Sequence, residues 1–144
     1  MSTPTTTERR SIEIFDTTLR DGLQVEGVTA TVDDKLAIAE QLDSLGVHFI
    51  EGGWPGANPK DIEFFQRAAK ELNLSTSTFV AFGSTRRPLG KVDDDPTLRN
   101  LLEAVTSAVC IVAKSWDYHV TEALQTTLDE GAAMISDSVE YLVG

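Results

Sequence analysis

A polar stretch near the start of the chain, residues 16–24, holds the side-chain types that a site for a metal ion and a small acid needs. Arg20 and Asp21 place a fixed positive charge beside a hard oxygen ligand, and the amide of Gln24 follows shortly after. Oxygen ligands suit Mg²⁺ and Mn²⁺, and the arginine fork matches the geometry of a carboxylate. One carboxylate cannot hold a catalytic metal by itself, and the sequence offers no clear second or third ligand.

Polar residues also follow three other apolar runs, so the candidate site residues gather at the ends of expected strands. The apolar runs are residues 12–15, 48–51, 78–82 and 108–113, and they begin at intervals of 30 to 36 residues. This spacing is typical of strand–helix units in a parallel sheet, and continuous apolar runs are typical of strands covered on both faces. The polar residues at their ends are Arg20, Asp21 and Gln24, then Glu51, then Ser84, Thr85, Arg86 and Arg87, then Lys114, Ser115, Asp117 and His119. Trp54 and Trp116 follow two of the runs and are expected to pack or to wall a pocket.

The segments between these runs carry the start signals and the apolar spacing of helices. The first three expected helices follow the capping residues Thr31, Asn58 and Asp95, with proline directly after two of them. The residues expected on their apolar faces are Leu36, Ala39, Leu42 and Leu45, then Ile62, Phe65, Ala69 and Leu72, then Leu98, Leu101 and Leu102. Residues 118–143 form a long fourth helical region that Gly131 could divide.

Four strand–helix units predict the α/β class and, more narrowly, the N-terminal half of a (β/α)8 barrel, a fold that usually needs about 250 residues. Residues 11–144 would form this partial catalytic domain, and the polar residues 1–10 are expected to be a disordered tail. An open four-stranded sheet with helices on both faces is the alternative. No glycine-rich phosphate-binding fingerprint follows the first run, which weakens a nucleotide-binding sheet.

Several of the strand-end residues also have a structural interpretation. Asp16 is expected to accept hydrogen bonds from the turn that follows it. Glu51 is costly to bury without a partner, so we expect it to meet a cation, either Arg20 in a structural pair or a group of a site. At least one of Arg86 and Arg87 is expected to lie in solvent, and His119 to be an ordinary residue at a helix start.

Composition narrows the class of protein. The chain has 144 residues, 41% of them hydrophobic, which fits a soluble globular domain. Its net charge of −11 argues against nucleic acid as the main partner but not against an anionic substrate, because a site can carry local arginine. The single cysteine, Cys110, is expected to be a buried thiol. Nothing resembles a signal peptide or a membrane span, so a cytoplasmic location without membrane contact is expected.

The stretch 16–24 resembles the signature of the metal-dependent aldolase-like barrels. This family includes the isopropylmalate, homocitrate and citramalate synthases and hydroxymethylglutaryl-CoA lyase. Three further blocks, residues 51–56, 82–87 and 114–120, look like the citramalate synthase branch within the citramalate and isopropylmalate synthase family. The resemblance covers the chain from residue 12 onward and implies the N-terminal half of a catalytic barrel.

The resemblance implies an acyltransferase that condenses acetyl-CoA with pyruvate, a step of branched-chain amino-acid biosynthesis. A divalent metal such as Mg²⁺, Mn²⁺ or Zn²⁺ would chelate the α-keto acid, and a base would take a proton from the methyl group of acetyl-CoA. Asp21 would be a metal ligand, and Arg20 a catalytic and substrate-binding group. Glu51 would act with Arg20 in catalysis, and Gln24 would bind substrate.

One departure from the family pattern affects activity. Family members supply two more metal ligands from a His-x-His pair, whereas the two histidines here, His48 and His119, stand far apart. The chain is therefore expected to be an incomplete fragment that is inactive by itself. Its open sheet edges would allow a homodimer. The alternatives are a fragment of a hydroxymethylglutaryl-CoA lyase-like or isopropylmalate synthase-like enzyme, and a non-catalytic half-barrel assembly module.

Overall fold

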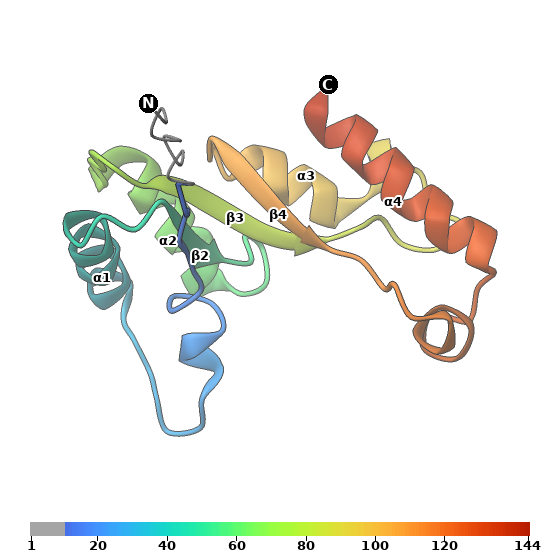
Figure 1. Ribbon diagram of the computed structural model, residues 1–144, viewed down its shortest axis with the longest axis horizontal. Coiled ribbons are helices and arrows are strands. Elements are labelled where there is room, and N and C mark those ends of the chain that lie inside the picture. Colours follow the sequence, from blue (N-terminus) through green and yellow to red (C-terminus); the bar gives the residue numbers. More distant parts are fainter. Residues whose placement is uncertain (1–10) are drawn as a thin grey trace, which may run out of the picture.

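The computed structural model describes residues 11–144, in which strands and helices alternate along the chain (Figure 1). The strands are β1 (Phe15–Asp16), β2 (Phe49–Gly53), β3 (Thr78–Ser84) and β4 (Ala108–Val112), and the α-helices are α1 (Val32–Ser44), α2 (Pro59–Glu71), α3 (Pro96–Glu103) and α4 (Leu128–Val143). Two short 3₁₀ turns, η1 (Gly22–Gln24) and η2 (Val92–Asp94), and one π-helical turn, η3 (His119–Ala123), complete the elements. The tail predicted at residues 1–10 lies outside the described residues.

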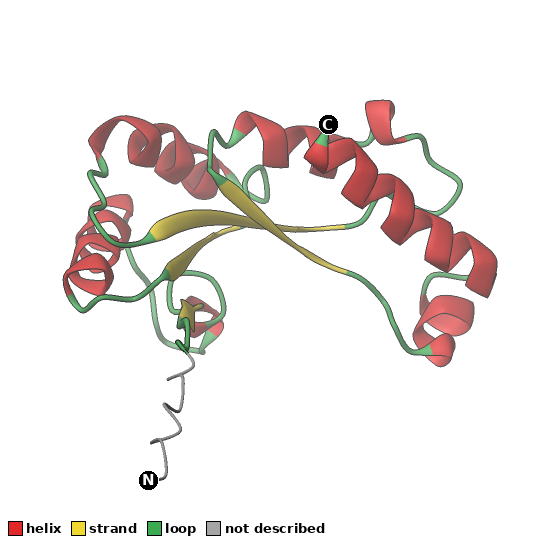
Figure 2. Ribbon diagram, turned by 45° about the horizontal axis from the view of Figure 1, so that its top comes forward, coloured by secondary structure: helices red, strands yellow, loops and turns green. Residues whose placement is uncertain are grey.

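The four strands form one parallel sheet in the order β1-β2-β3-β4. The α-helices lie along one side of the strands (Figure 2). Sequential order with helices on a single side is the arrangement of half of a (β/α)8 barrel, whereas an open doubly wound sheet has helices on both faces. The barrel prediction is therefore confirmed, and the open-sheet alternative is wrong.

The helix-covered face of the sheet holds the hydrophobic core. Ile50 and Ala81, at the centre of this face, are completely buried. Phe64 from α2 and Leu98 from α3 are equally buried and belong to the same cluster. Burying side chains of this kind stabilises the fold by roughly 1.5 to 3 kcal/mol each. The core thus fixes the strand ends on which the polar candidates sit.

Among residues 11–144 the opposite face of the sheet is open at its margins, whereas Glu51 and Val80 near its centre are each 1% exposed. Parallel register pairs Glu51 with Val80 and Phe82 with Cys110, so these side chains share that face. At its margins Phe15 is 44% exposed and Val112 is 42% exposed. The expectation that both faces would be covered thus holds at the centre of the sheet but not at its margins, because four strands close only half of a barrel.

The helix starts are those that the sequence predicts. The Thr31 hydroxyl accepts a hydrogen bond from the backbone N–H of Asp34 at 3.1 Å, and the Asp34 carboxylate accepts one from the Thr31 N–H in return. Asn58 caps α2 through the N–H of Asp61, and Asp95 caps α3. Helices antiparallel to the strands therefore begin at the same edge where the strands end.

Four predicted helix-face residues are exposed instead of buried: Leu45, Ile62, Ala69 and Leu102. Leu45 is 78% exposed because α1 ends at Ser44 and the chain turns there. Leu102 is 49% exposed and Ile62 is 43% exposed, since both lie on helix surfaces that no other described element covers. No helix of residues 11–144 has the length and apolar character that crossing a membrane would require.

The fourth helical region breaks earlier than the sequence predicts. The interruption falls at residues 124–127, between η3 and α4, and Gly131 lies inside α4. A Cβ at Gly131 would lie 3.0 Å from Cγ1 of Val120, so this glycine lets η3 pack closely against α4. The prediction that Gly131 divides the region is wrong because the residue serves packing.

Candidate functional site

The turn after β1 places Arg20 and Asp21 at the C-terminal edge of the sheet. The carbonyl oxygen of Thr17 accepts hydrogen bonds from the N–H groups of Arg20 and Asp21 at 3.1 and 2.8 Å. The Asp16 carboxylate accepts bonds from the N–H and the hydroxyl of Thr18 at 2.9 and 3.0 Å. Asp16 thus shapes the turn, which confirms its structural interpretation.

Arg20 is held by a buried carboxylate and an aromatic ring. Its Nε donates to Oε2 of Glu51, whose side chain is only 1% exposed at the end of β2. The guanidinium carbon lies 4.1 Å from the centre of the Phe82 ring of β3. A buried carboxylate needs a paired cation, and a ring face attracts one. The cation that Glu51 was expected to meet is therefore Arg20, and three strands cooperate to orient it.

A bulge in β2 brings Trp54 into the same region. The register with β3 shifts between Glu51 and Gly53, and Gly53 has a φ of +137°, a conformation that favours glycine. Trp54 then meets Phe82 edge to face, with ring centres 5.8 Å apart. Bulges commonly occur beside functional sites, where they redirect a side chain. Trp54 therefore packs, as expected, and it also lines a cavity.

Asp21 and Gln24 lie beside Arg20 but differ in their surroundings. The Asp21 side chain is 65% exposed, and its Oδ1 lies 3.5 Å from Nη1 of Arg20. Gln24 lines a cavity of about 320 Å³ together with Arg20, Leu23 and Trp54. The oriented guanidinium is suited to binding a small anion, and the solvent-facing carboxylate beside it is suited to meeting a metal ion. The structure therefore brings together the residues predicted at the first two strand ends.

The described residues do not form a complete metal site. Residues 11–144 contain no group of three or more histidine, cysteine, aspartate or glutamate side chains placed to hold a metal ion. A catalytic divalent metal needs several oxygen or nitrogen ligands, and Asp21 offers one. Asp21 as a metal ligand consequently stays a prediction.

Cys110 lies on the open face near the ion pair. Burial, and after it the negative charge of Glu51, raises the pKa of the Cys110 thiol above its ordinary value of 9.0. The side chain is partly buried, which is less than the sequence predicted. The thiol is therefore uncharged near neutral pH and adds no negative charge beside Arg20.

Of the candidates that follow β3, Arg86 performs a structural task. Arg86, whose side chain is 5% exposed, donates from Nη1 to Glu130 at 2.6 Å and from Nη2 to Asp137 at 2.7 Å. Its backbone N–H donates to the Ser138 hydroxyl at 2.9 Å. These bonds join the loop after β3 to α4. Arg87, in contrast, is exposed, as expected for at least one of the two arginines.

The strand-four candidates are not brought to Arg20. Lys114, Ser115, Asp117 and His119 are exposed, and none of them lines the cavity beside Arg20. The rings of His119 and Trp116 lie 4.8 Å apart, which fits the ordinary helix-start interpretation of the histidine. Ser84 and Thr85 likewise lie outside that cavity.

Three residues of the cavity were missed by sequence reasoning. Lys35, Lys60 and Asp61 line it from the first turns of α1 and α2. Their position just after a helix start could have identified them. Helices that alternate with parallel strands begin at the edge of the sheet where those strands end. Polar residues just after a helix cap therefore deserve the same scrutiny as those just after a strand.

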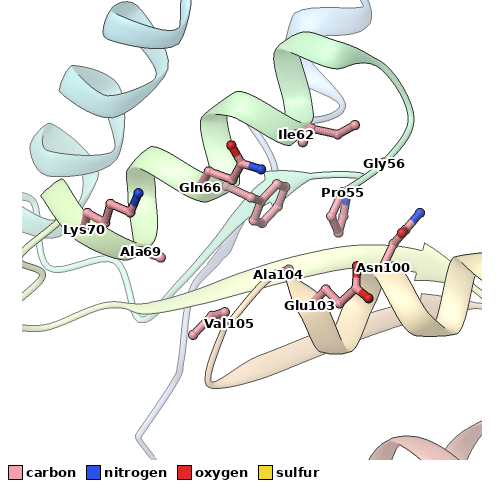
Figure 3. Close-up of a pocket in the computed structure, with 11 residues that line it drawn as sticks. Pro55, Gly56, Ile62, Gln66, Ala69, Lys70, Asn100, Glu103, Ala104 and Val105 are labelled. Atoms are coloured by element: carbon pink, nitrogen blue, oxygen red, sulfur yellow. The ribbon is translucent and has the colours of Figure 1, made fainter.

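A larger hollow, of about 430 Å³, lies away from these strand ends (Figure 3). It is a groove between α2 and α3, and Ile62, Gln66, Lys70, Glu103 and Val105 are among its lining residues. Arg20, Asp21, Gln24 and Glu51 do not contribute to it. Size alone therefore does not locate the site, and the smaller cavity has the convergent polar groups.

The amino-acid sequence of the chain is similar to those of known proteins. The model of the HMGL-like family matches residues 11–143. The (R)-citramalate synthase of Aquifex aeolicus is 56% identical over 131 residues, which are 91% of this chain and 25% of that protein. The (R)-citramalate synthase of Streptomyces coelicolor is 54% identical over 92% of this chain and 25% of that protein. The 2-isopropylmalate synthase of Pyrococcus furiosus is 36% identical over 92% of this chain and 25% of that protein.

Solved structures share the fold. An HMG-CoA lyase from Bacillus subtilis superposes with a TM-score of 0.64 at 22% identity, covering 92% of this chain and 42% of that one. An HMG-CoA lyase from Acinetobacter baumannii, in complex with coenzyme A and 3-methylmalate, also superposes with a TM-score of 0.64, at 20% identity. The match covers 90% of this chain and 41% of that one. The chain thus spans about a quarter of the length of the curated relatives it matches.

Proposed function

The chain belongs to the HMGL-like family, and on that premise we propose that it forms part of a citramalate synthase-like acyltransferase, which condenses acetyl-CoA with pyruvate. Identities of 56% and 54% to citramalate synthases, against 36% to an isopropylmalate synthase, support this choice. The product would enter branched-chain amino-acid biosynthesis.

The position of Arg20 is the observation that carries the proposal. The buried Glu51 carboxylate and the Phe82 ring hold the guanidinium before any substrate arrives. A preorganised cation stabilises negative charge that develops on a carbonyl oxygen, an effect worth several kcal/mol in a water-poor site. Arg20 would meet the carboxylate and carbonyl oxygens of the keto acid, and Glu51 would keep it oriented.

Gln24 and Asp21 would complete the part of the site that this chain supplies. The Gln24 amide faces the cavity beside Arg20 and can hydrogen-bond the substrate. Asp21 would be one ligand of a divalent metal, whose chemistry in such a site is to polarise the keto group. Residues 11–144 hold no group of three such ligands, so further ligands would be needed beside Asp21.

Two alternatives stay open as fragments of related enzymes. An isopropylmalate synthase-like enzyme would use the same Arg20 and Asp21 with a bulkier keto acid. A hydroxymethylglutaryl-CoA lyase-like enzyme would share the fold, which is all that identities of 20 to 22% support.

We also propose that the chain acts in the cytoplasm and that its open sheet edges allow self-association. Within residues 11–144 the free edges belong to β1 and β4, which are parallel strands at opposite ends of the sheet. A twofold axis along the strands would set β4 of one copy against β1 of another. Sedimentation at increasing concentration tests this arrangement, and a chain that stays monomeric throughout would overturn it.

A chimera tests the proposed activity directly. Residues 11–143, the range matched by the family model, would replace the corresponding quarter of the Aquifex aeolicus enzyme, which is 56% identical to the chain over 131 residues. We expect the chimera to release CoA from acetyl-CoA in the presence of pyruvate and divalent metal. An Arg20→Met version should lose at least about a hundredfold in turnover.

The matched control is an Arg99→Met version, which removes an exposed arginine on α3 and should keep the activity. A folded chimera that prefers a branched keto acid over pyruvate would favour the isopropylmalate alternative. A folded chimera without any condensing activity would overturn the proposal.

A further inference from the structure

A cavity of about 320 Å³ opens beside Arg20, between the loops that follow β1 and β2. That volume is at the lower end of the range for small-molecule sites, about 300 to 1,000 Å³. Leu19, Leu23 and Val28 give it an apolar wall, and Trp54 an aromatic one. The cavity adjoins the proposed reaction centre but extends past it to the first turn of α2.

The charged residues of this cavity are mostly positive. Arg20, Lys35 and Lys60 contribute three cations to its lining, and Asp61 contributes a single carboxylate. The chain as a whole carries a net charge of −11 and would repel anions. A local excess of positive charge inside a concave surface attracts an anion to that point.

Two of the three cations are already paired. Arg20 is held by Glu51. Lys35 donates from Nζ to Oδ1 of Asp61 at 3.0 Å and lies 4.2 Å from the centre of the Phe64 ring. Burial is the main cause that lowers the pKa of Lys35, and the bond to Asp61 opposes it. This pair joins α1 to α2, and both of its residues line the cavity.

Lys60 differs from the other two cations. It is exposed on the first turn of α2 and donates from Nζ to the carbonyl oxygen of Ala30 at 3.1 Å. Among residues 11–144 no carboxylate forms an ion pair with it. A neutral carbonyl does not compensate the charge of an ammonium group. Its charge is therefore available to a ligand.

We infer that this cavity binds an oxyanion of a substrate and that Lys60 is the charged group that meets it. The inference rests on the proposed function, which supplies two sources of such a group. One is the phosphate groups of acetyl-CoA, and the other is the carboxylate of the keto acid. In either case Gln24 and Trp54 would contact the uncharged part of the ligand from the same cavity.

Binding to the 144-residue chain tests the inference without turnover. Coenzyme A and pyruvate are titrated separately, and the indole N–H signal of Trp54 is followed by nuclear magnetic resonance. We expect Lys60→Glu to lower the affinity for the ligand that supplies the oxyanion roughly tenfold. That is the effect of losing one charge-assisted hydrogen bond. Lys60→Arg should restore most of the affinity.

Lys70→Glu is the matched control. Lys70 is exposed on the same helix but lines the separate groove between α2 and α3 (Figure 3). Lys70→Glu changes the net charge by the same amount as Lys60→Glu. It should leave the affinity for coenzyme A and for pyruvate within about twofold of that of the unmodified chain. An acidic residue near a helix N-terminus is favourable, so Lys60→Glu is not expected to unfold α2.

Each outcome decides the inference. Weaker coenzyme A binding in Lys60→Glu assigns the oxyanion to phosphate, and weaker pyruvate binding assigns it to the carboxylate. Equal loss in both charge variants, no change in Lys60→Glu, or no Trp54 shift with either ligand in the unmodified chain overturns it. An inactive chimera would overturn the proposed activity but would leave a Lys60-dependent binding result standing.

Discussion

Arg20 after β1 and Arg86 after β3 stand at comparable positions in the sheet but are used differently. Arg86 is 5% exposed and bonds to Glu130 and Asp137 through its guanidinium. Arg20 is 22% exposed; it pairs with the buried Glu51, and the exposed Asp21 lies 3.5 Å from its Nη1. An arginine whose donors are occupied by protein groups joins elements, whereas one that is oriented and partly open can meet a ligand.

The neighbours of the two arginines explain this difference. Glu130 and Asp137 belong to α4, so Arg86 connects a loop to a helix that is distant in sequence. Glu51 and Phe82 belong to the sheet, so Arg20 is held at the edge where the cavity opens. The first region stabilises the fold, and the second is the proposed site of chemistry.

The largest expected effect on stability is that of Arg86→Met. It leaves Glu130 and Asp137 without their cation, and breaking a pair with a buried member should cost about 3 kcal/mol in the free energy of unfolding. Urea denaturation measures this loss. Arg87→Met, at an exposed position, should change stability by less than about 0.5 kcal/mol. Equal effects in the two variants would remove the distinction drawn for Arg86.

Glu51→Gln should have a smaller effect on stability but a clear effect on binding. Arg20 can regain water, so the expected loss is about 1 to 2 kcal/mol. Pyruvate binding should weaken roughly tenfold because the guanidinium is no longer held. Glu103→Gln, on the exposed surface of α3, is the control for both measurements. Unchanged pyruvate affinity in Glu51→Gln would mean that Arg20 does not need this partner.

Cys110 reports on the same ion pair through its reactivity. Its pKa is raised by burial and by Glu51, so less thiolate is present near neutral pH than in a free cysteine. Because the thiolate is the nucleophile, alkylation by iodoacetamide should be several-fold slower than that of a model thiol and should accelerate as pH rises. Glu51→Gln removes one cause of the shift and should speed the reaction. A rate in Glu51→Gln equal to that of the unmodified chain would show that the carboxylate does not act on the thiol.

The smallest expected effect on stability is that of Asp21→Asn. The Asp21 side chain is 65% exposed and its contact with Arg20 spans 3.5 Å, so unfolding should change by less than about 0.5 kcal/mol. Any dependence of pyruvate binding on Mg²⁺ should disappear in this variant. A large stability loss with metal dependence intact would make Asp21 a structural residue.

The sequence predicted the fold well because local signals and tertiary structure agree. The caps at Thr31, Asn58 and Asp95 all form as expected. Apolar runs at regular intervals gave the parallel strands, since such runs form a sheet only with crossovers between them. Gly131 was misjudged because its role depends on Val120, a contact that helix propensity does not contain.

The candidate site was predicted only in part. Motif position identified Arg20, Asp21 and Glu51, and the structure brings Arg20 into contact with both carboxylates. The same reasoning could not predict that Arg86 forms ion pairs with α4, because those pairs join residues that are 44 and 51 positions apart. Lys60 was missed because its place in the cavity follows from where α2 begins relative to β1.

A titration of the 144-residue chain with pyruvate, followed through the Nε–H signals of its arginines, tests the central claim most directly. If Arg20 is the oriented group that meets the keto acid, its signal should shift in a saturable way and that of Arg86 should stay fixed. A shift at Arg86, or no shift at Arg20 up to saturating pyruvate, would contradict the assignment of the site to the end of β1.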